Sequence, residues 1–218
     1  MRTEAAQLRL LTWFSPAFPV GAFGYSHGLE TAIREGRAAN SPALQAWIEG
    51  LLEHGSGWTD AVIFRLAWSA ADAGELAELA ELATALAPSL ERRLETLRLG
   101  AAFLAAVRPW IEAAAPVAPE TPYPVAAGAA CAAAGVPLEA ALTAWLHAFA
   151  ANLVSVGVRA IPIGQADAVT ILAAIEPVVL DIADRAAAAG ADDLGGCAFL
   201  SDIAAMRHET LQPRLFIS

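Results

Sequence analysis

From Ser41 to Leu52 the chain reads SPALQAWIEGLL, and its apolar side chains are spaced as in a helix with one buried face. They stand at relative positions i, i+3, i+4, i+7 and i+8, which share one side of an α-helix. Serine followed by proline is a typical helix start, because serine caps the first turn and proline fits its first position. The stretch therefore predicts an amphipathic helix that begins at Ser41-Pro42 and buries Leu44, Trp47, Ile48, Leu51 and Leu52.

The same kind of pattern extends along the chain in both directions. We expect further helices over residues 4–14, 26–36, 59–73, 75–87, 89–108, 137–159, 167–189 and 199–206, the first carrying Leu8, Leu11 and Phe14 on its apolar face. Four prolines between residues 116 and 124 predict a loop, and Pro177 predicts a kink in the helix that contains it. The sequence thus predicts an all-α fold, a single helical-bundle-like domain of eight to ten helices over residues 1–218, with an extended tail over 207–218.

Composition narrows the classes of function. The chain of 218 residues is 57% hydrophobic, has a formal net charge of −10, and carries arginine but no lysine. An acidic surface without a basic stripe repels phosphate groups, so we expect neither nucleic-acid binding nor docking on anionic membranes. Only Cys131 and Cys197 are present, and they lie far apart in the sequence. This cysteine content favours a reducing, cytoplasmic setting over a disulfide framework or a structural zinc site.

One apolar stretch, from Ala140 to Val158, is nearly long enough to cross a bilayer. It contains Thr143, His147 and Asn152, and many of its apolar residues are alanine. We therefore expect a buried core helix, with a small helical membrane protein as the alternative. The first residues, Met1 to Glu4, include an acid and start no apolar run, so no signal peptide is expected.

The pattern Gly24-Tyr25-Ser26-His27-Gly28 matches the G-x-S-x-G motif of serine hydrolases. That motif works because a strand delivers the serine to a sharp turn at the top of a parallel sheet. The residues before Ser26 instead predict one helix and a loop with two prolines. Helix capping by Ser26 is the simpler interpretation, and a serine hydrolase that uses Ser26 is the alternative function.

The four histidines do not form a recognisable metal-binding pattern. His208 and Glu209 are adjacent, and with residues from a second subunit they would make a metal site at an interface. A lone histidine is more often a hydrogen-bonded surface or core residue. We expect no metal or cofactor bound by this chain.

Two features near the end of the chain suggest a partner surface. Arg159 ends the most apolar helix, where a cation either complements the helix C-terminus or faces an acidic partner. The tail carries Leu215, Phe216 and Ile217, whereas the last residues of a chain are usually polar. These side chains either pack on the domain itself or become ordered on a partner.

Three stretches together resemble the urease accessory protein F family. The first runs from Ser15 to Glu30 and reads SPAFPVGAFGYSHGLE; the second joins Asn152 to Arg159 and Pro162 to Asp167. The third is Met206 to Thr210 followed by Arg214-Leu215-Phe216 and Ser218. Their order and spacing agree with the family over essentially the whole chain. Residues 70–122 match only faintly, around Glu95-Thr96 and Arg98, and we assign them no function.

The resemblance implies an all-helical, cytoplasmic, non-enzymatic factor in urease maturation. In that family the protein dimerises and binds the D-type accessory protein, called H in some organisms. Together they recruit the nickel-binding GTPase and deliver nickel to apo-urease.

The resemblance also assigns site residues, position by position. The N-terminal signature contributes Pro19, Gly21, Tyr25, Gly28 and Glu30 as a partner surface, and Arg159 stands where the family carries a basic residue that contacts the GTPase. The tail residues that would order against the D-type protein are His208, Glu209, Arg214, Leu215 and Phe216.

Overall fold

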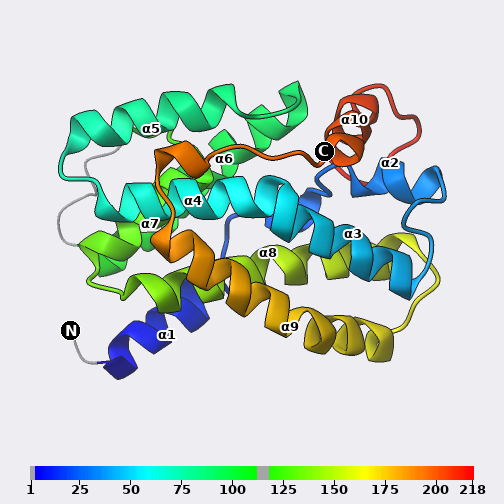
Figure 1. Cartoon of the computed structure of the whole chain (residues 1–218), viewed down its shortest axis with the longest axis horizontal. Helices are drawn as coiled ribbons and strands as arrows, with labels where there is room; N and C mark the ends of the chain where they lie inside the picture. Colours follow the sequence, from blue (N-terminus) through cyan, green and yellow to red (C-terminus); the bar gives the residue numbers. More distant parts are fainter. Residues whose placement is uncertain (1–2, 112–117) are drawn as a thin grey trace.

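The computed structural model describes residues 3–111 and 118–218, and within these ranges the regular secondary structure is entirely helical. The α-helices are α1 (Thr3–Trp13), α2 (Leu29–Arg34), α3 (Ser41–His54), α4 (Ser56–Ser69), α5 (Ala73–Ala85), α6 (Leu90–Val107), α7 (Tyr123–Ala133), α8 (Leu138–Ala160), α9 (Gln165–Ala188) and α10 (Phe199–His208), as Figure 1 shows. Three short 3-10 turns join them: η1 (Ala22–Gly24), η2 (Arg108–Trp110) and η3 (Ala191–Asp193). The all-α prediction is confirmed.

Several helix starts differ from the expectation by a few residues. Asn40, not Ser41, caps α3, and its side chain accepts a hydrogen bond from the Ala43 amide at 3.0 Å. The helix expected to open at Thr59 begins at Ser56. Gly74 does not end that helix but lies in the first turn of α5, which Asp72 caps. For α3 and α5 a polar side chain just upstream accepts hydrogen bonds from free amides of the first turn, whereas Gly55 at the start of α4 makes no such cap.

The helix expected from Ser26 begins at Leu29, and Gly28 is its N-cap. The expected cap at Ser89 is confirmed, because its hydroxyl accepts a hydrogen bond from the Arg92 amide at 3.2 Å. Pro177 lies inside α9 and does not divide it. The proline loop was predicted over residues 116–124. Residues 116 and 117 lie outside the described part of the chain, and residues 118–122 are non-helical. Its end was wrong, because Pro124 lies in the first turn of α7, where a proline is tolerated.

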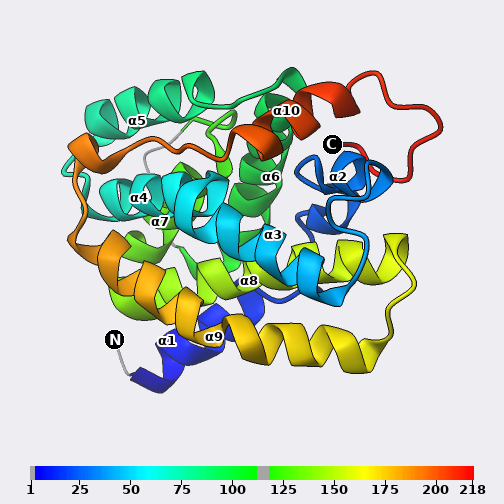
Figure 2. The same cartoon turned by 45° about the vertical axis from the view of Figure 1, so that its right-hand side comes forward.

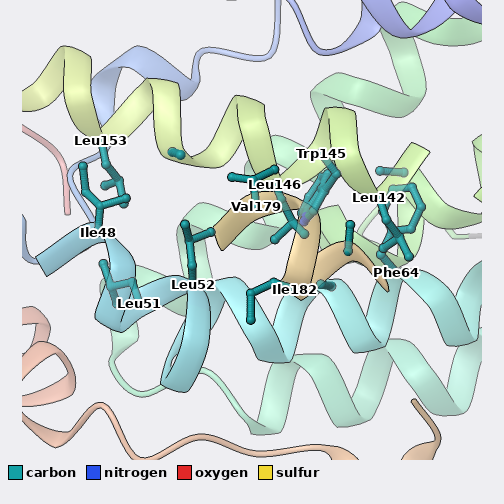
Figure 3. Close-up of a cluster of buried hydrophobic side chains, with 14 of the residues drawn as sticks. Ile48, Leu51, Leu52, Phe64, Leu142, Trp145, Leu146, Leu153, Val179 and Ile182 are labelled. Carbon is teal, nitrogen blue, oxygen red and sulfur yellow. The ribbon is translucent and has the colours of Figure 1, made fainter. Parts of the chain in front are cut away.

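The hydrophobic core forms around α8, against which α3, α4 and α9 pack. Leu142, Leu146 and Leu153 on α8 are fully buried, and Figure 3 shows Leu146 beside Val179 and Ile182 of α9. By length and composition α8 would cross a membrane, but 56% of its most apolar window is buried in the protein. A core helix passes the same test of length and composition, and this burial favours the core interpretation.

The first helix turns a different face to the core than expected. Leu8 and Leu11 are 65% and 73% exposed, whereas Ala6, Leu10 and Trp13 are buried. The ring of Trp13 packs edge-on against Phe103 of α6, with ring centroids 6.0 Å apart. The aromatic contact of Trp13 therefore fixes the rotation of α1 and leaves two leucines in solvent.

At one end of the molecule α2 and α10 lie side by side, and the chain's last residues return to the same place (Figure 2). The close approach depends on Gly28, whose φ of +77° favours glycine. A Cβ at this position would lie 2.5 Å from the backbone nitrogen of Ala205 in α10. This end of the molecule brings the N-terminal loop, α8 and the tail together.

Candidate partner-binding site

The tail lies alongside the segment that leads into α2. The Ile217 amide donates to the Gly24 carbonyl, and the Ser26 amide donates to the Ser218 carbonyl, both at 2.8 Å. The Ser218 hydroxyl reaches Glu95 of α6 at 2.5 Å. Backbone pairing of this kind places two segments that are more than 190 residues apart in sequence at one site.

The Glu30 carboxylate is the main anchor of the tail. It is 2% exposed and accepts hydrogen bonds from the amides of Leu215, at 2.9 and 3.0 Å, and Phe216, at 3.0 Å. Arg34 adds an ion pair at 3.1 Å. Burial alone would raise the pKa of Glu30, but the hydrogen bonds from the two amides and from His208 outweigh it and hold the pKa below its ordinary value. Glu30 therefore stays ionised while it holds the tail.

His208 links this anchor to α6. Its ring is fully buried, with Nε2 at 3.3 Å from Glu30 and Nδ1 at 2.6 Å from Glu91. Arg214 forms an ion pair with the second oxygen of Glu91. Two carboxylates, an imidazole and a guanidinium thus connect α2, α6, α10 and the tail in one polar network.

Arg159 holds the tip of the tail from α8. Its Nε donates to the Ser155 carbonyl at 3.1 Å, and its Nη1 donates to the Phe23 carbonyl at 2.6 Å. The guanidinium also lies 4.6 Å from the centroid of the Phe216 ring. The contact with Ser155 agrees with the capping role, and the other two join Arg159 to the loop and the tail.

Most of the other residues expected at the site lie in the same place. Tyr25 is buried, and its carbonyl accepts a hydrogen bond from the Asn152 side chain at 3.3 Å. Glu209 accepts from the Leu90 amide at 2.9 Å and so satisfies the start of α6. Pro19 and Gly21 are the exceptions, because they line a neighbouring cavity and do not contribute to the tail network.

The tail packs on its own domain in this structure, yet part of it faces outward. Phe216 is buried, whereas Leu215 is 71% and Ile217 46% exposed. Phe23, next to Gly24 on the loop, is 71% exposed, and Ile217 contacts Gly24. We call the exposed apolar side chains of Phe23, Leu215 and Ile217 the apolar tip; buried polar anchors hold the tail backbone that carries two of them.

A second buried charged cluster was not expected from the sequence. Arg92 and Glu95 of α6 form an ion pair, and Glu95 also lies 2.9 Å from His27. Burial opposes ionisation, but Arg92 and His27 lower the pKa of Glu95 to about 2. Burial and the charge of Arg92 lower the pKa of His27, so its ring is neutral. Asp60 of α4 pairs with Arg92 only at 4.0 Å, and burial raises its pKa to about 6.

These charged residues were missed because nothing in a sequence distinguishes a charged side chain that will be buried from one that will be exposed to solvent. Asp60, Glu91, Arg92 and Glu95 resemble the solvated acids and bases of any amphipathic helix. The one available signal was the faint family match around Glu95, which we set aside.

The geometry gives Ser26 no catalytic arrangement. Ser26 is fully buried, and its hydroxyl donates to the Ser218 carbonyl. Its neighbour His27 points its Nε2 toward Glu95 and packs its ring edge against Phe149, with centroids 5.0 Å apart. A nucleophile needs an exposed oxygen within reach of a base, so this arrangement favours a structural role for Ser26.

Across residues 3–111 and 118–218, no group of three or more histidine, cysteine, aspartate or glutamate residues is arranged to hold a metal ion. His208 is enclosed by two carboxylates and is not presented at the surface for a metal shared between subunits.

Comparison with known proteins places the chain in one family. The UreF family model matches residues 39–176. The chain is 50% identical over 218 residues to the urease accessory protein UreF of Mesorhizobium japonicum, an alignment that covers 99% of this chain and 98% of that protein. It is 52% identical over 216 residues to the UreF of Agrobacterium fabrum, covering 98% and 97% of the two chains. It is 49% identical over 215 residues to the UreF 1 of Brucella canis, covering 98% and 94%. The chain therefore belongs to the UreF family of urease accessory proteins.

Proposed function

We propose that this chain is a non-enzymatic urease maturation factor. It binds the D/H-type accessory protein, and the two together recruit and regulate the nickel-binding GTPase that delivers nickel to apo-urease. The chain acts in the cytoplasm as a homodimer, as one domain over residues 1–218 with the tail over 207–218 as a partner-binding segment. No cofactor is part of this role.

The observation that carries the proposal is the apolar tip on its buried anchors. Interfaces commonly combine exposed aromatic and aliphatic side chains with nearby arginines. Phe23, Leu215 and Ile217 stand beside Arg159 and Arg214 on a surface whose backbone is fixed by Glu30 and His208. A surface that is ordered before binding loses less conformational entropy when a partner docks.

The division of roles within the site follows from exposure. The buried residues Tyr25, Gly28, Glu30, His208 and Phe216 position the surface, whereas Arg159, Arg214 and Leu215 are presented to a partner. Glu209 supports α6 beside them. Pro19 and Gly21 are proposed to act through the loop that carries Phe23.

Co-purification tests the proposal directly. The tagged chain is expressed with the D-type protein and the nickel GTPase, and the eluate is analysed by size-exclusion chromatography with light scattering. We expect one assembly that contains two copies of this chain. A chain that binds neither protein would refute the proposed function and would leave the fold and family assignment intact.

Reversing the charge at Arg159 should separate the two interactions. We expect Arg159→Glu to weaken recruitment of the GTPase at least tenfold and to leave the D-type complex in place, because it reverses one interface charge. Arg185→Glu reverses a charge on α9 outside the site, so it should bind both partners normally. Equal loss of both partners in Arg159→Glu would mean that Arg159 acts only by holding Phe23 and Phe216.

A further inference from the structure

A cavity of about 400 Å³ lies between the N-terminal loop, α6 and α8. This volume is in the range of small-molecule sites. Its wall is rich in aromatic rings, and two of them, Tyr123 and Trp145, have centroids 4.6 Å apart. The partner-binding role described above gives this cavity no function. Its aromatic lining residues are Trp13, Phe14, Phe18, Phe23, Tyr123, Trp145 and Phe149.

The ionisable groups along the cavity carry a net negative charge. They are Asp60, Arg92, Glu95 and the two histidines His27 and His147. Arg92 and Glu95 neutralise each other as a close ion pair. The Asp60 side chain is 22% exposed, and its distance of 4.0 Å from Arg92 is beyond hydrogen-bond range. Among these charges, that of the Asp60 carboxylate is the one without a partner inside hydrogen-bond range in this lining.

The Asp60 carboxylate is the acceptor that this lining offers to a donor from a ligand. The lining also holds a buried polar atom with no hydrogen-bond partner among the described residues, Nδ1 of His27. Nε2 of the same ring lies 3.2 Å from Nη1 of Arg92, which can only donate, and 2.9 Å from Glu95, which accepts, so its two neighbours favour opposite tautomers. The ligand donor is therefore assigned to Asp60 alone.

We propose that this cavity binds a small organic cation, an amine or amidine on a flat apolar body, with Asp60 as its counter-ion. Aromatic faces attract a cation through their negative quadrupole, and the attraction increases when the site is desolvated. The flat body would pack among the rings while the N–H groups reach Asp60. The indole N–H groups of Trp13 and Trp145 are buried and have no hydrogen-bond partner within the described part of the chain, so water or an acceptor on the ligand would satisfy them.

Three probes of nearly the same shape and different charge test this proposal. Benzamidine is a cation, benzamide is neutral and benzoate is an anion, and each is titrated calorimetrically into the full chain at pH 7.5. We expect benzamidine to bind at least tenfold more tightly than benzamide, and benzoate to bind most weakly. Equal affinity for the three probes, or no binding of benzamidine at millimolar concentration, would overturn the proposal.

Two variants then test the role of Asp60. Asp60→Asn keeps the shape and removes the charge, and we expect it to weaken benzamidine binding about tenfold without changing benzamide binding. Asp202→Asn is the matched control, since Asp202 lies near Arg92 and lines only an adjoining pocket, whereas Asp60 borders both that pocket and the aromatic cavity. Benzamidine binding that Asp60→Asn leaves unchanged would contradict the assignment of the counter-ion. The probe series on the unchanged chain does not depend on how either variant folds, nor on whether the chain binds its protein partners.

Discussion

Gly28 is a single position at which a missing methyl group determines how two helices meet. Its φ of +77° is strained for any other residue, and a Cβ would overlap the backbone of Ala205 at 2.5 Å. Backbone atoms cannot move aside as a flexible side chain can. The residue is therefore needed both for its conformation and for the space it leaves to α10.

We expect Gly28→Ala to lower the free energy of unfolding by about 1–3 kcal/mol more than Gly36→Ala does. Gly36 has nearly the same φ, +76°, but no atom lies within 4 Å of its added Cβ. The control therefore carries the backbone strain without the overlap. Urea denaturation of both variants measures the difference, and equal losses would mean that α10 moves away at no cost.

The partly buried Asp60 carboxyl should make stability depend on pH. Burial raises its pKa to about 6 in the folded state, above the ordinary value of 3.8. Above pH 6 the folded state holds a charge that is more costly there than in the unfolded chain, and protonation relieves this cost as the pH falls from 7 toward 4. Asp60→Asn should therefore raise the free energy of unfolding at pH 7 by about 1–3 kcal/mol.

The same gain should shrink as the pH falls through 6, because the wild-type carboxyl then becomes neutral as well. Denaturation curves of the two proteins at several pH values between 5 and 8 test this. A gain that stays constant across this range would show that charge is not the cause.

Among the elements, local chemistry was predictable and non-local contacts were not. The start of the helix expected over residues 89–108 was predictable, because the Ser89 hydroxyl satisfies an amide within the same turn, a contact that depends on local sequence alone. By contrast, Leu8 and Leu11 were expected on the buried face of α1. The contact of Trp13 with Phe103 instead orients the helix so that both leucines are exposed.

For the site, the family resemblance identified the segments but not their contacts. It predicted Glu30, His208 and Arg159 as partner-binding residues, and in the structure all three contact the tail or the loop beside it. It did not indicate that Glu30 and His208 are buried, because burial results from pairing between distant segments. The contacts of Glu91 and Glu95 were not predicted, because their partners, His208 and His27, are 117 and 68 residues away in sequence.

The tail is an element that can be removed without loss of helix. Ending the chain after Leu211 removes only non-helical residues, since α10 ends at His208. We expect the far-ultraviolet circular dichroism to stay nearly unchanged and binding of the D-type protein to be lost. Pull-down with the D-type protein measures the second effect.

A double variant refines the truncation. Leu215→Ser with Ile217→Ser changes two exposed residues of the apolar tip and keeps the buried anchor Phe216. It should also lose the D-type protein while the tail stays in place. If the D-type protein still binds after both changes, its interface must lie elsewhere on the molecule.

At the scale of the whole molecule, one core built around α8 connects the helices. The apolar pattern predicted a central helix, and its buried leucines agree with that prediction. Leu146 should be among the costly positions, because it is fully buried between α3, α4 and α9 (Figure 3).

We expect Leu146→Ala to lower the free energy of unfolding by about 2–5 kcal/mol, from lost burial and the cavity left behind. Leu180→Ala on α9 is the control, since Leu180 is 47% exposed and should change stability by less than about 0.5 kcal/mol. Guanidinium denaturation compares them. A small effect at Leu146 would indicate that the neighbouring helices close the gap.

The pairing of Glu30 with Phe216 across 186 residues also has a consequence for how the protein is made. A ribosome that adds about 5–20 residues per second needs about 10–40 s to travel from one to the other. During that interval the nascent chain carries an unpaired Glu30 and an incomplete docking surface. A partner that recognises the apolar tip would therefore ignore unfinished copies, and assembly would begin only once synthesis has reached the tail.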